Sequence, residues 1–329
     1  MAKDSRASGL DRILVLEVAR VTEAAAFAAA RQRGRGNEKA ADKAAVDAMR
    51  RELALLPIRG TVVIGEGEMD EAPMLFIGEK VGAGHGPEVD IAVDPLEGTT
   101  ICAKVMPNAL AVLAIAERGG LLHAPDMYMN KIAIGPGYPE GLIDLDASHA
   151  DNLNALAKAK GVPVSHITAC ILDRPRHAEL IKAVRAAGAA VQLIPDGDIA
   201  GVFWTTNPEE TGIDIYMGSG GAPEGVLAAA ALACIGGQIE GRLIASNEGE
   251  RVRAAKMGIP DINRKFKLAD MASADVIFSA TGVTSGSILQ GVKFRGDTAE
   301  TETLVMRSKT GTVRRIKTTF RDVGRRYGS

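Results

Sequence analysis

The sequence predicts an α/β protein whose two halves differ in the order of their elements. In the first half, two long amphipathic segments precede a group of apolar strands, which is typical of an α+β arrangement. In the second half, strands and helices alternate, which is typical of an α/β arrangement with ligand sites at the strand ends. A length of 329 residues also suits two domains. We place the boundary near residue 165, giving domains over residues 1–165 and 166–329.

The first half is predicted to begin with two helices. Apolar residues recur at helical spacing over residues 9–33 and again over residues 40–55. The glycine-containing run 34–37 separates the two segments, and Pro57 ends the second. The strands that follow are expected at residues 61–64, 89–93, 109–116 and 131–134, with a hairpin turn at 117–120.

The second half is predicted to alternate between strands and helices. The residues 174–177 lead into a helix that ends near residue 187, and Pro223 suits the first position of a later helix, which reaches Cys234. A hairpin is expected around Thr310 and Gly311, followed by a polar, frayed tail over residues 321–329. The strands of this half are expected at residues 167–172, 190–194, 213–217, 276–278, 303–307 and 313–319.

Composition and charge exclude several classes of protein. A net charge of −2 and 4% aromatic residues do not suit a nucleic-acid-binding surface. The three cysteines, Cys102, Cys170 and Cys234, form no CxxC pair and are expected to be reduced and buried. The polar start lacks an apolar signal core, and the most apolar run, residues 226–235, is shorter than the about 20 residues that span a bilayer. We therefore expect a soluble, cytoplasmic protein without a membrane partner.

The stretch from residue 89 to residue 100 is the first candidate site. An apolar strand reaches Asp94, and Pro95 is expected to end it because proline has no N–H to donate to a sheet. Glu97 follows three residues after Asp94, with Gly98 and Thr99 directly behind it. Two carboxylates beside a glycine and a hydroxyl suit a hard metal ion and a phosphate. An ordinary strand-to-helix turn with solvated acidic residues is the alternative.

Three further carboxylates stand where predicted elements begin or end. Asp42 lies on the apolar face of the second helix, although capping or the helix dipole could also explain an acidic residue there. Glu66 lies between two glycines after a strand, where a solvated acidic loop that includes Asp70 and Glu71 is the alternative. Glu224 follows the run Gly218–Gly221 in the first turn of a helix, where the helix dipole alone would also favour it.

Together these carboxylates indicate a metal-dependent phosphomonoesterase. An all-oxygen set of ligands suits Mg²⁺ or Mn²⁺, and such ions activate water for attack on phosphorus. Arg174 and Arg176 can bind a second phosphate in fork geometry. The sequence contains neither GxxxxGK[ST] nor a GxGxxG that opens a helix after a strand, which disfavours a nucleotide-binding loop or a dinucleotide dehydrogenase.

Several motifs resemble one family of phosphatases. The run from Asp94 to Thr99, Asp-Pro-Leu-Glu-Gly-Thr, is similar to the Asp-Pro-φ-Asp-Gly-Thr signature of the lithium-sensitive phosphatase superfamily, with Glu97 in place of the second Asp. The runs at residues 34–42, 64–73, 124–129 and 220–225 narrow the resemblance to the class II, GlpX-type fructose-1,6-bisphosphatases. The similarity extends from about residue 10 to residue 320, with the motifs in the same order.

The resemblance implies a layered α-β-α-β-α sugar-phosphatase fold and hydrolysis of the 1-phosphate of fructose 1,6-bisphosphate in gluconeogenesis. It implies Mn²⁺ or Mg²⁺ as the cofactor and a homodimer or homotetramer as the assembly. A close alternative is a bifunctional enzyme that also hydrolyses sedoheptulose 1,7-bisphosphate in a carbon-fixation cycle. A sugar-phosphate sensor without activity would require a missing catalytic group, and every matched group is present.

The resemblance also implies roles for individual residues. Thr99 matches the catalytic threonine that positions the attacking water, and Asp94 and Glu97 belong to the same catalytic segment. Two departures from the family pattern are Thr100, where a larger and often basic residue is common, and Arg174, where lysine is frequent. The implied metal ligands are Asp42, Glu66, Asp94, Glu97 and Glu224. The implied substrate-binding residues are Glu97, Gly98, Thr99, Tyr128, Arg174, Pro175, Arg176, Asp196, Gly197, Asp198 and Gly221.

Overall fold

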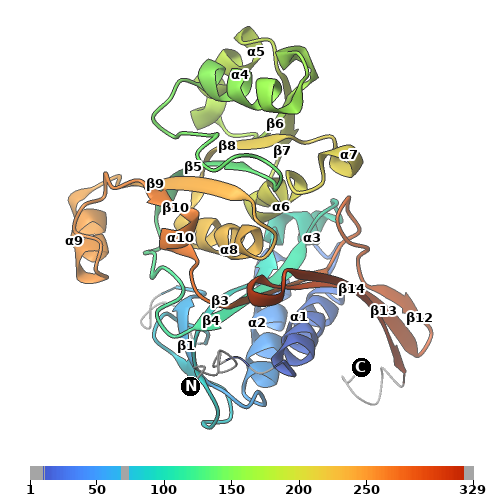
Figure 1. Ribbon diagram of the computed structural model, residues 1–329. Helices are drawn as coiled ribbons and strands as arrows, with labels where there is room; N and C mark the ends of the chain where they lie inside the picture. The colour runs from blue at the N-terminus through green and yellow to red at the C-terminus, as the bar shows by residue number, and fades with distance from the viewer. Residues whose placement is uncertain (1–9, 11, 68–73, 322–329) are drawn as a thin grey trace, which may run out of the picture. The chain divides into compact units, whose positions relative to one another are not determined.

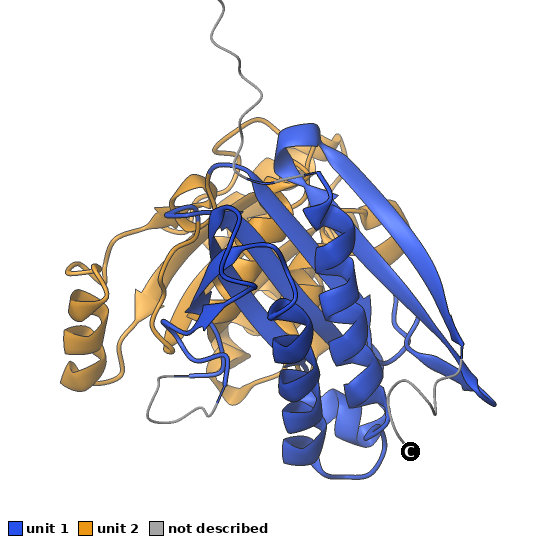
Figure 2. Ribbon diagram, turned by 90° about the horizontal axis from the view of Figure 1, so that it is seen from below, with its two compact units in different colours: residues 1–120, 274–329 blue, residues 121–273 orange. Residues whose placement is uncertain are grey.

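The chain forms two compact units (Figures 1 and 2). The structure is a computed structural model that describes residue 10, residues 12–67 and residues 74–321. Unit 1 comprises residues 1–120 and 274–329, and unit 2 comprises residues 121–273. Each unit contains helices and a mixed sheet, so the predicted α/β class is confirmed. No helix in the described ranges is long and apolar enough to cross a membrane.

The two units do not coincide with the predicted domains. Residue 165 lies inside unit 2, in the short helix η1 (Val164–His166), whereas the units divide after residue 120 and after residue 273. The difference arises because strands join sheets by long-range pairing. β5 (Tyr128–Ile134) pairs with strands of unit 2, and the last strands of the chain return to the sheet of unit 1. Local sequence patterns do not reveal these partners.

In the described residues, unit 1 contains an eight-stranded sheet. Its order is β12-β13-β11-β4-β3-β1-β2, and β14 pairs with β13 as a further antiparallel strand. Only β1 and β3 run parallel to each other within it. The strands are β1 (Arg59–Ile64), β2 (Lys80–Val81), β3 (Glu88–Glu97), β4 (Leu110–Glu117), β11 (Val276–Gly282), β12 (Lys293–Arg295), β13 (Thr298–Arg307) and β14 (Thr312–Arg321).

Two helices cover one face of this sheet, as Figure 2 shows. They are α1 (Leu14–Ala30) and α2 (Glu38–Leu53), which confirms both predicted helices. Their apolar faces join the inward side chains of β1, β3 and β4 in one hydrophobic core. Asn37 caps α2, because its side chain accepts a hydrogen bond from the Ala40 N–H at 3.0 Å. The core therefore fixes β3, the strand that carries the first candidate site.

The strand β3 does not end before Pro95, so that prediction was wrong. The register pairs Asp94 with Val112 and then Glu97 with Leu110, which inserts one extra residue into β3. Such a bulge removes one residue from the ladder, and a proline is tolerated there because no N–H is required. The Asp94 carboxylate accepts a hydrogen bond from the Leu96 N–H at 3.1 Å within the bulge. Glu97 consequently ends the strand.

In unit 2, the described residues form a six-stranded sheet of order β10-β9-β5-β8-β6-β7. The hairpin predicted at residues 117–120 was wrong, because β4 pairs with β3 and β11 whereas the next strand, β5, pairs with β8 and β9. The strands are β5, β6 (Thr168–Leu172), β7 (Ala190–Ile194), β8 (Ile215–Gly221), β9 (Gln238–Ile244) and β10 (Phe266–Lys267).

Helices lie on both faces of the sheet in unit 2 (Figure 1). One face is covered by α4 and α5, whose apolar side chains share a core with β5, β6 and β8. On the other face, α6 and α8 contact each other and the central strands. The helices are α4 (His149–Lys160), α5 (Ala178–Ala186), α6 (Asp198–Trp204), α7 (Pro208–Thr211), α8 (Ala222–Ala233), α9 (Glu248–Lys256) and α10 (Leu268–Met271), with η2 (Pro175–His177) before α5.

Three further predictions concern the cysteines, the hairpin near residue 310 and the C-terminal tail. All three cysteines are buried thiols, as expected. The hairpin around residues 310–311 is confirmed, with η3 (Ser308–Thr310) and a left-handed Gly311 between β13 and β14. Of the predicted frayed tail, residues 321–329, Arg321 is the last residue of β14, and residues 322–329 lie outside the described residues.

A buried carboxyl group lies between α1 and the hairpin of β13 and β14. Glu23 is 5% exposed, and its Oε1 accepts a hydrogen bond from the Thr318 hydroxyl at 2.6 Å. Burial raises the pKa of the Glu23 carboxyl above its ordinary value. The folded protein therefore binds a proton here more readily than the unfolded chain, and the resulting stabilisation is present below the unfolded-state pKa and lost as the pH rises through the folded-state pKa.

Replacing Glu23 by glutamine is expected to remove this loss of stability. The amide keeps a hydrogen-bond acceptor for Thr318 but carries no charge. Thermal unfolding should give E23Q a higher Tm than the wild type at about pH 7.5, with the difference shrinking toward about pH 4. A matched control is E52Q, which changes a partly exposed glutamate of α2. If E23Q unfolds at a lower temperature than the wild type at neutral pH, the proposed cost of ionising Glu23 is contradicted.

Candidate active site

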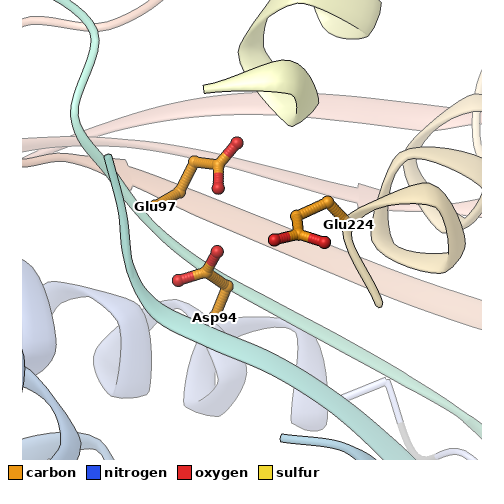
Figure 3. A group of neighbouring side chains, drawn as sticks. All are labelled: Asp94, Glu97 and Glu224. Carbon is orange, nitrogen blue, oxygen red and sulfur yellow. The ribbon is translucent and has the colours of Figure 1, made fainter. Parts of the chain in front are cut away.

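Two carboxylates come together at the end of β3 in unit 1. A carboxylate oxygen of Asp94 and one of Glu97 lie within 4.8 Å of each other. Figure 3 shows both carboxyl groups beside the end of the strand. The Glu97 side chain is buried, with 5% of the residue exposed, whereas Asp94 is partly exposed. Like charges at this separation repel each other, so a cation between them would lower the free energy of the pair.

The bulge explains why these two residues approach each other. Without an extra residue, positions 94 and 97 would face opposite sides of a regular strand, since side chains alternate. The insertion between Asp94 and Glu97 changes this alternation. The bulge that carries β3 past Pro95 therefore also forms the candidate site.

The chain then turns sharply into a short helix. Gly98 has φ 82°, in the left-handed region that favours glycine, and a Cβ there would lie 3.0 Å from the Ile101 side chain. The helix α3 (Thr99–Lys104) starts directly after it, so Thr99 is its first residue and Thr100 its second. Both threonines are partly exposed. Thr99 therefore lies at the start of α3, two residues beyond Glu97.

Asp42 lies in α2, five residues after the N-cap Asn37. Capping therefore does not account for this aspartate, because Asn37 performs that role. The side chain is half-buried, and burial raises the pKa of its carboxyl. A carboxyl group that loses hydration without a compensating charge gains from a bound cation. Asp42 thus has the environment of a ligand.

Glu66 follows β1, and a close approach of two backbone segments holds it. The Glu66 N–H donates to the Leu75 carbonyl at 3.0 Å. A Cβ at Gly65 would lie 1.9 Å from that carbonyl oxygen, so only glycine fits at position 65. The neighbouring acidic residues Asp70 and Glu71 lie outside the described residues. Among the residues that the structure describes, neither Asp42 nor Glu66 joins Asp94 and Glu97 in a group with ligand atoms all within 4.8 Å.

Glu224, the remaining predicted ligand, lies in the first turn of α8 in unit 2 and is also labelled in Figure 3. A Cβ at Gly221 would lie 1.8 Å from a Glu224 carboxylate oxygen. A side chain at position 221 would therefore displace the Glu224 carboxylate from its present position. The predicted substrate-binding Gly221 and the predicted ligand Glu224 are thus in contact within unit 2.

Two predicted substrate-binding side chains of unit 2 form a pair. The Arg176 guanidinium carbon lies 4.7 Å from the centroid of the Tyr128 ring. Arg176 follows Pro175 in η2, and Tyr128 begins β5 opposite Gly221. Both side chains are exposed, with 47% of Tyr128 accessible. A cationic group on an aromatic face, open to solvent, is suited to binding an anion.

The predicted substrate-binding residues 174 and 196–198 form different contacts. An Arg174 nitrogen lies 3.7 Å from an Asp196 oxygen, and both side chains are about one third exposed. Gly197 has φ 86° and precedes α6, which Asp198 begins. Asp198 is 6% exposed and forms an ion pair with Lys131. The carboxylate of Asp198 is therefore held in the interior of unit 2 by a buried cation.

Three polar residues of unit 2 were not predicted from the sequence as site residues: Lys131, His177 and Ser219. Lys131 is 1% exposed and also donates to the Gly221 carbonyl at 2.8 Å. His177 and Ser219 contact each other next to Arg176. One signal was available for Lys131, since a lysine within an apolar strand must have a buried partner. No local pattern marked Ser219, whose partners lie more than 40 residues away along the chain.

Comparison with known proteins supports a single family. Residues 12–320 match the family described as "Bacterial fructose-1,6-bisphosphatase, glpX-encoded". The chain is 48% identical over 320 residues to "Fructose-1,6-bisphosphatase 1 class 2" of Escherichia coli (strain K12), covering 93% of this chain and 94% of the relative. The same identity and coverage hold for "Fructose-1,6-bisphosphatase class 2" of E. coli O6:H1 (strain CFT073) and of Shigella flexneri. This chain therefore belongs to the glpX-encoded bacterial fructose-1,6-bisphosphatase family.

Proposed function

We propose that the protein is a metal-dependent phosphomonoesterase that hydrolyses the 1-phosphate of fructose 1,6-bisphosphate to fructose 6-phosphate and phosphate. Membership of the family and the names of the relatives support the reaction and the substrate. The observation that carries the proposal is the pair of carboxylates, Asp94 and Glu97, followed directly by Gly98 and Thr99. Paired carboxylates with an adjacent hydroxyl suit hydrolysis at a metal-bound phosphate.

We propose Mn²⁺ or Mg²⁺ as the cofactor. The ligand atoms at the end of β3 are carboxylate oxygens within 4.8 Å of each other, and hard divalent cations prefer such oxygen ligands. Burial of Glu97 and the raised pKa of Asp42 also favour a bound cation, since each carboxylate lacks full hydration. The proposed ligands are those expected from the sequence, Asp42, Glu66, Asp94, Glu97 and Glu224.

The residues of the chain would share the work of the reaction. When bound, the cation would polarise the phosphate and lower the pKa of a water molecule. Thr99 would orient an attacking water by a hydrogen bond, so that a bond from the water oxygen to phosphorus forms while the bond between phosphorus and the sugar oxygen breaks, with the water's proton passing to the leaving sugar oxygen. The backbone at Gly98, which carries no side chain of its own, would allow the phosphate to approach the start of α3. Asp94 and Glu97 would hold the cation through their own carboxylate oxygens.

Unit 2 would supply the groups that bind the sugar and its distal phosphate. Tyr128 and Arg176 form an exposed cationic pair, and an arginine side chain suits a phosphate because its planar fork can donate two parallel hydrogen bonds. The remaining proposed contacts are Arg174, Pro175, Asp196, Gly197, Asp198 and Gly221. We further propose a role in gluconeogenesis, in the cytoplasm, by a homodimer or homotetramer.

A phosphate-release panel tests the proposed function. Fructose 1,6-bisphosphate, fructose 1-phosphate, fructose 6-phosphate and sedoheptulose 1,7-bisphosphate would each be supplied with Mn²⁺ or with Mg²⁺. The proposal predicts the highest kcat/KM for fructose 1,6-bisphosphate and no release from fructose 6-phosphate. Comparable kcat/KM for the two bisphosphates would instead indicate the bifunctional enzyme. Absence of release from every bisphosphate with either metal would contradict the proposal.

A further inference from the structure

The guanidinium of Arg176 is held in place by neutral groups of unit 2. Its Nε donates to the Ser219 hydroxyl at 3.0 Å, and its Nη2 donates to the Ser219 carbonyl at 2.8 Å. The Tyr128 ring covers one face of the group. An arginine has five N–H donors, and within the described part of the chain Ser219 uses two of them. Three donors therefore remain available on an exposed, fixed guanidinium.

Arg176 differs in this respect from its neighbour Arg174. Arg174 lies 3.7 Å from the Asp196 carboxylate, which offsets part of its charge. In the described ranges, Arg176 forms no ion pair within 4.0 Å, and its partners are a hydroxyl, a carbonyl and an aromatic ring. Its positive charge is therefore not neutralised by an ion pair with the residues that the structure describes. A fixed arginine with uncompensated charge is suited to an anionic ligand.

His177 holds Ser219 in place next to Arg176. The His177 Nδ1 lies 2.8 Å from the Leu172 carbonyl oxygen, so Nδ1 carries the proton and Nε2 is the acceptor. Nε2 accepts the Ser219 N–H at 2.9 Å and lies 3.0 Å from the Ser219 Oγ. The single lone pair of Nε2 is thus used by the Ser219 N–H, so His177 holds the backbone of Ser219, and the Ser219 Oγ accepts the Arg176 Nε–H.

Burial and close packing keep this histidine in the required state. His177 is 3% exposed, and burial lowers the pKa of its ring, which favours the neutral form. A Cβ at Gly218 would lie 3.2 Å from the ring, so the backbone of β8 fits closely against it. The order of contacts is therefore Leu172, His177, Ser219 and Arg176, with each donor facing an acceptor.

We propose that Ser219 and His177 are positioning residues that hold Arg176 for the distal phosphate of the substrate. This inference rests on the proposed function, because it concerns the phosphate that is not hydrolysed. Ser219 fixes the guanidinium before the substrate arrives, so less conformational entropy is lost on binding. His177 acts through Ser219 and does not touch the substrate.

The test compares two substrates in the variant S219A. For fructose 1,6-bisphosphate, KM is expected to rise about tenfold while kcat changes by less than about twofold, since only binding of the distal phosphate is weakened. For fructose 1-phosphate, which lacks that phosphate, kcat/KM should change by less than about twofold. S219T retains the hydroxyl and should restore KM to within about threefold of the wild type. S165A, which changes an exposed serine of η1 in the same unit, is the matched control.

Double variants separate positioning from a general structural role. In the R176A background, adding S219A should raise KM no further, because the residue that Ser219 positions is gone. H177F, which removes the Nε2 acceptor, should give the same bisphosphate-specific increase and should not add to S219A. A further rise in KM in the R176A background, an equal loss with both substrates, or an unchanged KM in S219A would overturn the inference. Absence of phosphate release by the wild type would contradict the proposed function, and the inference with it.

Discussion

Replacing Thr99 by alanine is expected to lower kcat for fructose 1,6-bisphosphate by about 100-fold or more. Thr99 is the first residue of α3, directly after the left-handed Gly98 and two residues beyond the buried Glu97. Without the hydroxyl, the attacking water would lose the group that we propose orients it. The KM should change little, because the substrate would keep its other contacts. Steady-state kinetics of phosphate release with saturating Mn²⁺ measures both constants.

Thr100 provides the control for this experiment. It is the next residue of α3 and is also partly exposed, so T100A removes the same chemical group from the same helix turn. We expect kcat of T100A to stay within about threefold of the wild type. The thermal unfolding midpoints of T99A and the wild type should agree closely, since neither threonine belongs to the core. A T99A variant with wild-type kcat would remove Thr99 from the mechanism.

Replacing Asp94 by asparagine is expected to abolish nearly all activity, with a fall in kcat/KM of about 1,000-fold or more. Asparagine preserves the size of the side chain and can still accept the Leu96 N–H, so the bulge should persist. What is lost is one negative charge next to Glu97, and with it a proposed ligand. The affinity for Mn²⁺, measured by titration calorimetry of the metal-stripped protein, should fall by at least about tenfold.

A second aspartate of β3 controls for damage to the strand. Asp90 is 3% exposed, and its Oδ2 accepts the Gly119 N–H at 2.7 Å. D90N retains an acceptor at this position and lies outside the proposed site, so its affinity for Mn²⁺ should match the wild type. Wild-type binding of Mn²⁺ by D94N would contradict the assignment of Asp94 as a ligand.

The parts of the fold that the sequence predicted are those specified by local interactions. The helices α1 and α2 follow from apolar periodicity, and α8 from Pro223 at its start. The pair Asp94 and Glu97 was visible for the same reason, because only two residues separate the two carboxylates in the sequence. The resemblance to a family of phosphatases, carried by several short motifs, then gave these local features a function.

The parts that it did not predict depend on residues far apart along the chain. The membership of β5 in the second sheet follows from pairing with β8 and β9, which lie well beyond it in sequence. The bulge in β3 is defined by its register with β4, and Pro95 alone indicated the opposite outcome. The buried pair of Lys131 and Asp198 joins residues 67 positions apart. Such contacts become visible only in the folded chain.

The dependence of phosphate release on a divalent metal tests the central claim most directly. The purified protein would be stripped of metal with a chelator, supplied with fructose 1,6-bisphosphate, and then titrated with Mn²⁺ or Mg²⁺ while phosphate and fructose 6-phosphate are measured. The proposed function predicts no turnover before metal is added and equal amounts of the two products afterwards. Undiminished turnover in the chelated protein, or no turnover after either metal is restored, would contradict it.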